Sequence, residues 1–579
     1  MKLIKFIVAL TLTLLLPSVV HAQNISDIAK SDPLIITGAV GTQNTYHYSS
    51  VGDGYASPMS NSVYANLNIN LYGISMPFAF YYTNDNLNYS HPQISFNISP
   101  TYKNWTGHLG QSSMDMSSYV MNMSWNGVGL EYNTDKFRVG AFYGRLRAAI
   151  NPDPTDPFAR TPQYKRMGWG FKAGFGSDKN YVDIYLLRAY DQLKSLDERW
   201  RESIAPQENI VVGVKGCVTP TPWLSFTANA ATSAFSTNTT AESLPTSTQF
   251  DKIFDTKYSS LARFAGDANM NLSFSNFNTS ISYRLVQPDY TSLGSYYMSN
   301  NYQSLGITAS TNLFNRIALS GTFNGQSDNL TNKQMYTTRG FVYGANASSR
   351  IGNHFNIAIG YNGYLQRQDD GTVQVTDSSE VHRVMNSYSL TPSYSFDTDD
   401  FGHSISVSAN YTENKDLNKF ATGESDVKTT ALGLSYGLNV KPWEMDFTGS
   451  LSHQQSKGYK TKYTSDVASL STSRSFLEDK NLNVSATVSV IYNEVERQSK
   501  NMSIGCDFSA SYTLKKVHVF SASAAFNKYG DVNITKTKSN LDCTDITMSL
   551  NYAYTFSLLS IKSKSTKEKE KQERMVSKM

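Results

Sequence analysis

The sequence predicts an all-β fold: a transmembrane up-and-down antiparallel β-barrel of about 26 strands, within a range of roughly 22–28. Three observations lead to this prediction. Apolar residues recur at every second position along much of the chain, short turns alternate with longer polar segments, and the number of turns implies an even number of strands. Bacterial barrels made of one chain have even strand numbers.

The period-two pattern is clearest in residues 482–492, where Leu, Val, Ala and Tyr alternate with Asn, Ser and Thr. The same pattern returns in residues 355–361, 405–409 and 546–556. Because successive side chains of a strand point to opposite faces, each segment predicts a ribbon with one apolar and one polar face. A soluble β-sandwich would produce the same alternation, so this pattern alone does not indicate a membrane.

The connections between the ribbons favour a barrel. Short turns are predicted at residues 73–75, 103–105, 134–136, 176–180, 219–222, 275–277, 313–316, 352–354, 397–402, 441–443, 477–480 and 514–516. Longer polar segments separate them, such as residues 366–380, 412–424, 453–464, 493–500 and 528–540. This succession is typical of a barrel with short periplasmic turns and longer extracellular loops. Twelve turns join about 24 strands, and one strand at each end gives about 26.

Composition agrees with strands that are apolar on one face only. Apolar residues make up 40% of the chain, below the roughly 45–50% of soluble domains, while aromatic residues reach 12% and charged residues only 17%. The net charge of +4 arises at the two ends, from Lys2 and Lys5 and from seven basic against three acidic residues in 562–579. The body between them is slightly acidic, so we expect no nucleic-acid partner.

The termini predict export to the outer membrane. Residues 1–22 have the features of a secretory signal peptide, with Lys2 and Lys5, a short apolar run and Ala22 at the cleavage site. The apolar run is shorter than the roughly 20 residues that span a bilayer. We expect residues 23–33 to form a short periplasmic segment, 34–557 the barrel, and 558–579 a basic, solvated tail. Both termini would be periplasmic, and no plug domain is expected before the barrel.

Aromatic residues gather at the ends of the predicted strands. They are Trp105, Trp223 and Trp443 after short turns, and residues 81–82, 296–297 and 552–556 at strand ends. Such rings settle at the depth of lipid headgroups and form the girdles of a membrane barrel. Ordinary core aromatics are the alternative, but the clustering at strand ends favours a girdle.

A family resemblance rests on residues 32–34, 68–78, 99–103 with Trp105, 108–110, 136–138, 143–146 and 164–168. In these segments the chain resembles a group of large, functionally uncharacterised outer-membrane β-barrel proteins of Bacteroidota. The resemblance covers about the first third of the chain and implies the same barrel and location, but no activity. Barrels of this location usually end on an aromatic residue, whereas here a tail follows Phe556. The outer-membrane insertion machinery would therefore use an internal signal.

Four charged residues between positions 136 and 190 are candidate functional residues: Arg138, Arg166, Lys172 and Asp183. Each is predicted to lie on the face of its strand that does not carry the apolar side chains. A charge that faced lipid at mid-membrane would cost about 2–4 kcal/mol. We therefore expect a lumen-lining charged cluster. It could line a path for an anionic or polar solute, or Arg and Asp could pair across the wall and stiffen it. Glycines on this face leave room for an internal plug, a partner or a solute.

No catalytic motif is apparent, so we expect no enzymatic activity. The histidines are scattered, and no GxSxG, HExxH or phosphate-loop pattern occurs. The acidic turns at 367–371 and 397–400 are too short for a calcium loop, so no metal or other cofactor is expected. Cys506 and Cys543 should lie one strand apart, about 10 Å, beyond disulfide reach. We expect free thiols buried in the wall.

Two functional classes remain open. The first is a channel or transporter for polar solutes without an N-terminal plug. The second is a barrel that docks periplasmic or surface partners in a multi-protein outer-membrane assembly. A lumen this wide cannot be filled by side chains of the wall. Long loops could fold inward, a periplasmic or lumen-filling protein could occupy it, or the barrel could flatten. A soluble secreted β-protein is a third interpretation.

Overall fold

The protein is described by a computed structural model, which covers residues 34–50, 58–84, 94–155, 160–245, 254–377, 380–496, 498–531 and 543–561. The predicted signal peptide, the segment 23–33 and the tail from residue 562 lie outside these described residues.

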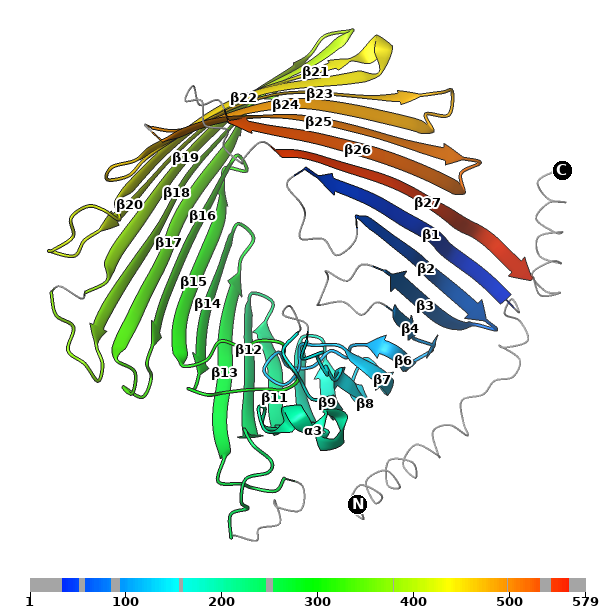
Figure 1. Cartoon of the computed structure of the whole chain (residues 1–579), viewed down its shortest axis with the longest axis vertical. Coiled ribbons are helices and arrows are strands. Elements are labelled where there is room, and N and C mark those ends of the chain that lie inside the picture. Colours follow the sequence, from blue (N-terminus) through cyan, green and yellow to red (C-terminus); the bar gives the residue numbers. More distant parts are fainter. Residues whose placement is uncertain are drawn as a thin grey trace.

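All strands belong to one antiparallel sheet of 27 strands (Figure 1). The first nine are β1 (Leu34–Ser49), β2 (Met59–Leu71), β3 (Ile74–Thr83), β4 (Ile94–Ile98), β5 (Thr101–Tyr102), β6 (Trp105–Ser112), β7 (Trp125–Asn133), β8 (Phe137–Arg147) and β9 (Arg166–Ser177). The next nine are β10 (Asn180–Asp191), β11 (Glu208–Thr221), β12 (Leu224–Ser236), β13 (Ser260–Ser273), β14 (Phe277–Val286), β15 (Tyr302–Leu313), β16 (Ile317–Asp328), β17 (Tyr336–Ile351) and β18 (Phe355–Asp370). The last nine are β19 (His382–Asp397), β20 (Phe401–Asp416), β21 (Val427–Val440), β22 (Met445–Lys457), β23 (Lys462–Phe476), β24 (Leu482–Val495), β25 (Ser499–Leu514), β26 (His518–Asp531) and β27 (Cys543–Ile561).

The sheet closes on itself, because β1 pairs with both β2 and β27. β4 and β5 share one position in the wall, since each lies between β3 and β6. Pro100, which lacks a backbone N–H, stands in the gap between them. The barrel therefore has 26 strand positions, and the predicted fold class and strand number are confirmed.

The twelve predicted short turns are the connections at one end of the barrel, where β1 begins and β27 ends. The predicted loops are less accurate, because each of the five polar segments starts inside a strand. Most of residues 453–464 and 493–500 are strand, with short connections after Lys457 and after Val495. Strands that extend beyond the apolar band are polar on both faces, so their sequence resembles a loop. β27 runs to Ile561, past the expected end of the barrel at residue 557.

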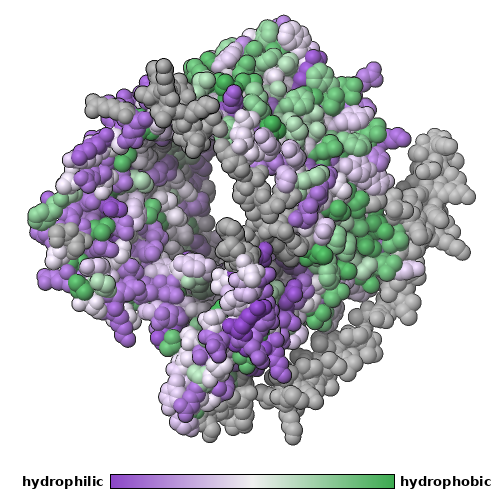
Figure 2. All heavy atoms as spheres, viewed as in Figure 1, coloured by the Kyte–Doolittle hydropathy of each residue, from purple (hydrophilic) through white to green (hydrophobic). Residues whose placement is uncertain are grey.

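The two faces of the wall differ in polarity. On β27, Met548 and Leu550 are 51% and 63% exposed on the outer face, whereas Ser549 between them meets Thr45 of β1 at 3.1 Å on the inner face. In Figure 2 green apolar residues gather on the wall at the top and right of the view, and an opening is visible in the middle of the barrel. An apolar band of this kind is the surface that a membrane barrel presents to lipid.

Aromatic rings form rows on the outer face. Tyr343, Tyr361, Tyr388 and Tyr411 follow one another across β17–β20, with ring centroids 5.0–6.3 Å apart. The girdle prediction was wrong for residues 296–297, which lie in the connection between β14 and β15 instead of at a strand end.

The three cysteines are free, as expected for Cys506 and Cys543. Their predicted burial is wrong: Cys506 is exposed and Cys543 is half-buried. Cys506 lies near the middle of β25, between Ile504 and Phe508 on the outer face, both of which are exposed. The apolar surroundings of Cys506 are thus on the outer face of the wall.

Helical structure is minor in the described residues. It comprises α3 (Glu198–Arg201) and the 3₁₀ turns η1 (Leu193–Ser195) and η3 (Lys441–Trp443). Within the described part of the chain, none of these helices has the length and apolar character needed to cross a bilayer.

Candidate functional site: the barrel interior

Two connections fold into the barrel against one side of its wall. The methionine loop (residues 113–124) joins β6 to β7, and the tyrosine loop (residues 287–301) joins β14 to β15. Their buried side chains form one apolar cluster with inward residues of β7, β8 and β10–β14. Inward folding of long loops, one of three ways considered for the lumen, is therefore what the described residues show.

Methionines and aromatic rings fill this cluster. Met114, Met116, Met121 and Met123 are each at most 7% exposed. Trp125 stacks on Phe142 with centroids 4.1 Å apart and planes at 18°. Unbranched methionine side chains fill irregular gaps well, which suits a loop packed on a curved sheet.

Hydrogen bonds join the two loops to each other. Gly294 accepts from the N–H groups of Asn122 and Met123 at 3.1 and 3.2 Å. The Tyr290 hydroxyl donates to the Tyr119 carbonyl at 2.9 Å, and Ser292 Oγ donates to the Val120 carbonyl at 2.5 Å. Burial raises the pKa of Tyr290 far above its usual range, so this phenol remains a donor.

Further hydrogen bonds fix both loops to the wall. Ser117 Oγ donates to Asn229 Oδ1 of β12 at 2.7 Å. Asn209 of β11, which is fully buried, accepts from the Leu293 N–H at 3.0 Å and donates to Ser233 Oγ at 2.7 Å. Buried polar groups that are all satisfied in this way hold a loop in one position.

The inward glycines of β8–β11 provide space for this packing. A Cβ at Gly170 would collide with the Phe142 ring, and one at Gly213 would come 2.5 Å from Val120 of the methionine loop. A Cβ at Gly174 would collide with Asp183. The room that these glycines leave is thus occupied by side chains of this same chain.

The four predicted charged residues all point inward, and each is in an ion pair. Arg138 and Asp183 meet at 2.9 Å, with Arg138 also donating to the Gly176 carbonyl at 2.9 Å. Lys172 Nζ lies 2.5 Å from Glu131 Oε2, and His108 Nε2 lies 2.9 Å from Oε1 of the same carboxylate. All three members of this second group are about 10% exposed.

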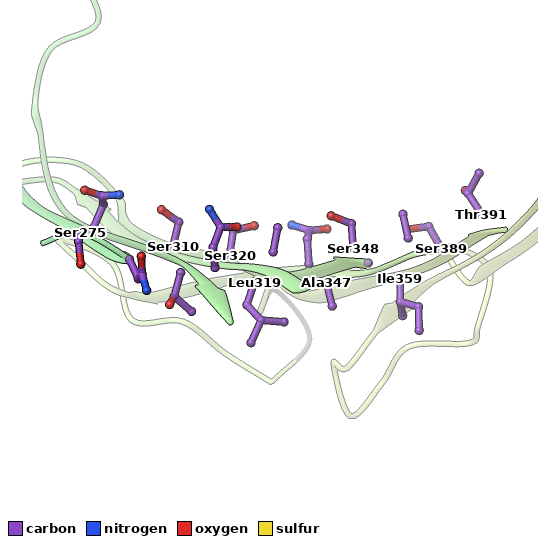
Figure 3. A pocket seen from close by; sticks show the side chains of 17 residues that line it. Ser275, Ser310, Leu319, Ser320, Ala347, Ser348, Ile359, Ser389 and Thr391 are labelled. Carbon is purple, nitrogen blue, oxygen red and sulfur yellow. The ribbon is translucent and has the colours of Figure 1, made fainter. Parts of the chain in front are cut away.

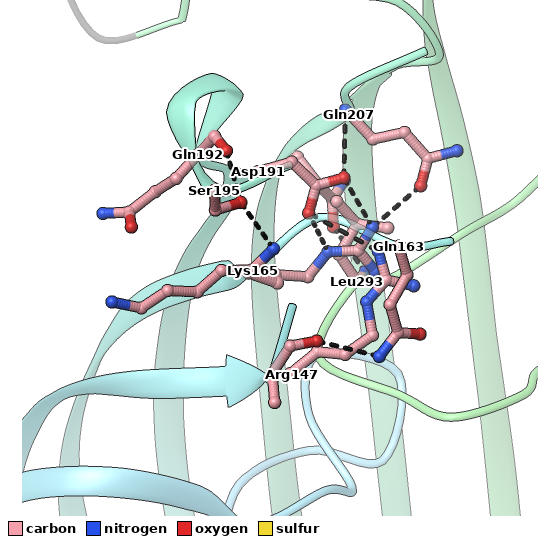
Figure 4. Close-up of polar contacts among 11 residues, drawn as sticks. Arg147, Gln163, Lys165, Asp191, Gln192, Ser195, Gln207 and Leu293 are labelled. Carbon is pink, nitrogen blue, oxygen red and sulfur yellow. Dashed lines mark hydrogen bonds and ion pairs between the residues drawn. The ribbon is translucent and has the colours of Figure 1, made fainter. Parts of the chain in front are cut away.

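Arg166 makes the most complete pair. Its guanidinium contacts both carboxylate oxygens of Asp191, at 2.8 and 3.0 Å, and donates to Gln207 Oε1 at 2.9 Å. The Gln207 N–H donates to Asp191 at 3.2 Å, as Figure 4 shows, and Arg147 lies 3.7 Å from the same carboxylate. Fork-to-fork Arg–carboxylate pairs are geometrically specific and strong.

The structure thus pairs Arg138 with Asp183, whereas Lys172 and Arg166 belong to two other ion pairs. The partners Glu131 and Asp191 were missed by sequence reasoning. Asp191 lies eight residues after Asp183 on the same strand. Residues an even number apart in a strand share a face, so this spacing could have assigned Asp191 to the lumen face. Glu131 lies between Leu130 and Tyr132, a position that also indicates the lumen face.

The part of the wall next to this cluster has a different inner face. Between β14 and β19 it carries hydroxyl and amide side chains, and a depression of about 290 Å³ is lined by inward residues such as Ser310, Ser320, Asn346, Ser348 and Ser389. Figure 3 shows Ser320, Ser348 and Ser389 on one side of the sheet and Leu319 and Ile359 on the other. This lining supplies hydrogen-bond donors and acceptors without net charge.

Among the described residues, no three His, Cys, Asp or Glu side chains lie together as a metal site requires.

Comparisons with known proteins give only distant likenesses. No protein-family model and no curated protein sequence matches this chain. The P pilus usher PapC translocation pore has 9% identity and a TM-score of 0.35, covering 90% of this chain and all of its own. OccAB3 of Acinetobacter baumannii has 13% identity and a TM-score of 0.31, covering 68% of this chain and 99% of its own. A bacterial polysaccharide outer membrane secretin has 10% identity and a TM-score of 0.26, covering 51% of this chain and 91% of its own. Similarities this distant carry no argument about function, which therefore rests on the residues of this chain.

Proposed function

We propose that the protein is an outer-membrane channel for polar solutes. The observation that carries the proposal is the inner wall of β14–β19, where hydroxyl and amide groups line a depression on the side of the sheet away from Leu319 and Ile359 (Figure 3). Such groups replace part of the hydration of a polar solute without binding it tightly. The outer apolar band supports a membrane location.

The proposal includes an orientation. The start of β1 and the end of β27 lie at the short-turn end of the barrel, and in bacterial barrels that end is periplasmic. Both termini would then be periplasmic and the long connections extracellular. We also propose membership of the Bacteroidota barrels that the chain resembles. This part of the proposal rests on the matched segments of the sequence, of which 99–103 with Trp105 covers β5 and the start of β6.

Ion pairs on the inner wall support a structural part for the charged cluster. Because Arg138, Arg166, Lys172 and Asp183 are all paired, they reinforce the wall that carries the loops. Their charges are mutually compensated, so we do not propose them as a selectivity filter for anions. The channel would therefore distinguish solutes mainly by size and hydrogen bonding.

The test is electrical. The purified full-length chain, reconstituted in planar lipid bilayers, is expected to give a steady conductance with weak selectivity between potassium and chloride. A heat-dependent shift in gel mobility of the same preparation checks that the barrel is folded. A folded barrel without conductance, which copurifies with a defined protein from detergent-solubilised membranes, would instead support the docking barrel. Recovery from the culture medium would contradict the membrane location.

A further inference from the structure

A second depression lies on the inner wall, where β2, β3, β4 and β6 meet the two ends of the methionine loop. Its volume is about 530 Å³, larger than the depression over β14–β19. The lining residues are Tyr64, Asn66, Ala79, Phe80, Tyr81, Ser95, Phe96, Asn97, Ser99, His108, Gln111, Ser112, Ser113 and Ser124. We call it the tyrosine–asparagine pocket.

Two tyrosines form one side of this pocket. Tyr64 of β2 and Tyr81 of β3 are direct cross-strand partners, so both side chains lie on the inner face. The Tyr64 ring lies over Gly41 of β1, where a Cβ would come 2.7 Å from the phenol oxygen. Tyr81 is 36% exposed, and Tyr64 is half-buried. Within the described part of the chain, neither phenol has a hydrogen-bond partner. Each of the two rings offers the pocket an apolar face with a polar end.

Amide and hydroxyl groups surround the rings. Asn66, two residues from Tyr64 on the same face, is exposed, and its amide makes no hydrogen bond to the described residues. Asn97 is held in place, because its Nδ2 donates to the Gln111 carbonyl at 2.8 Å and to Ser112 Oγ at 2.9 Å. One amide is thus open to a ligand and the other fixes the floor.

The backbone of the floor is shaped to allow this. Gly110 has φ +89°, and a Cβ there would collide with the Phe96 carbonyl. A larger residue could therefore not bring β6 this close to β4. Beyond this point the chain turns inward into the methionine loop, whose residues Ser113 and Ser124 complete the rim.

The pocket contains no Asp, Glu, Lys or Arg. His108 contributes a ring whose Nε2 is already engaged by Glu131 at 2.9 Å. A charged ligand would lose hydration here without gaining a counter-charge. A neutral ligand with an apolar face and a ring of hydroxyl groups fits both the tyrosine pair and the amides.

We propose that the tyrosine–asparagine pocket binds a neutral sugar ring, which makes the solutes of this channel neutral oligosaccharides. This inference rests on the proposed channel function. The apolar face of the sugar would lie against Tyr64 and Tyr81. Its hydroxyls would exchange hydrogen bonds with the Asn66 amide and with Ser124 Oγ. Aromatic anchors with a few placed polar groups are the usual construction of small-ligand sites.

The test uses single channels of the full-length protein in planar bilayers. Neutral oligosaccharides of four to six glucose, mannose or xylose units, α- and β-linked, are added in a panel, with polyethylene glycol of equal size as control. At least one sugar is expected to interrupt the current reversibly, and polyethylene glycol is not. Tyr64→Ala, Tyr81→Ala and Asn66→Ala should each raise the half-blocking concentration about tenfold, a change of roughly 1.4 kcal/mol.

A matched control is available on the same strand. Tyr82 follows Tyr81 but faces outward and is 41% exposed, so Tyr82→Ala should leave sugar block unchanged. Conductance without block by any sugar, or equal block by polyethylene glycol, would overturn the pocket while leaving the channel in place. Absence of conductance from a folded barrel would overturn the channel itself. Loss of block in Tyr82→Ala as well would also contradict the assignment.

Discussion

Ser117 and Asn229, 112 residues apart in the chain, share a buried hydrogen bond of 2.7 Å that fixes the methionine loop to the inner face of β12. The loop is thus part of the wall and not a free lid. Its position narrows the lumen on one side only, while the hydroxyl-lined side remains open to solutes.

Removing this hydrogen bond is expected to loosen the loop. Ser117→Ala leaves the buried Asn229 amide without its partner, a change that costs about 1–3 kcal/mol. We expect a lower temperature for the gel-mobility shift and a noisier open-channel current. Ser348→Ala, on the inner wall of β14–β19 and outside the interior cluster, is the control and should change neither. If Ser117→Ala had the same current noise and the same gel-shift temperature as the unaltered protein, the loop would be held by packing alone.

Shortening the methionine loop is expected to widen the channel. Replacing residues 115–122 by Gly-Ser-Gly removes Met116, Tyr119, Val120 and Met121 from the interior cluster. Conductance should rise, because the cross-section of the lumen increases. Bilayer recordings measure it, and exclusion of polyethylene glycols of graded size measures the diameter. An unchanged conductance would mean that the narrowest point lies elsewhere.

The Arg166–Asp191 pair is expected to be essential for stability. Asp191→Asn leaves the guanidinium buried at 8% exposure without a counter-charge, and breaking such a pair costs about 3–5 kcal/mol. The temperature of the gel-mobility shift should fall strongly. Arg199→Ala is the control, since its pair with Asp197 is half-exposed and contributes at most about 1 kcal/mol. Equal effects of the two substitutions would contradict the structural part assigned to the inner pair.

Cysteine labelling tests the two faces of the wall. Cys506 lies between Ile504 and Phe508 on the outer face, whereas Cys217 accepts a hydrogen bond from Thr227 Oγ1 at 3.8 Å. In liposomes, a lipid-soluble maleimide should label Cys506, and a charged, water-soluble maleimide should not. Cys506→Ser provides the control. Labelling of Cys506 by the charged reagent would place it in the lumen and reverse the assignment of faces.

An epitope inserted after Gly423, in the connection between β20 and β21, tests the orientation. Antibody should bind it on intact cells, because the long connections are proposed to be extracellular. The same epitope after Asp479, in the turn between β23 and β24, should become accessible only after the outer membrane is permeabilised. The opposite result would invert the barrel in the membrane.

The strands could be predicted from the sequence because each one lies between lipid and a polar lumen. That contrast repeats at every second residue, as in residues 482–492, and the short turns carry their own signals. The methionine loop could not be predicted, because Met114, Met116, Met121 and Met123 have no strand or helix period. Their burial depends on partners such as Tyr290, which are remote in sequence. The alternation of side chains along a strand placed Arg166 and Lys172 on the lumen face. That alternation does not identify their ion-pair partners on neighbouring strands.

The seam between β1 and β27 has a consequence for assembly. Residues Leu34–Ser49 can pair with Ile561–Asp545 only after nearly the whole chain has been synthesised and delivered. Until then both edges of a growing sheet expose unpaired backbone N–H and C=O groups to lipid or to other chains. The edge of β1 therefore stays without its β27 partner while 24 further positions are added, with aggregation as the competing fate. We expect insertion of this barrel to be slow for that reason.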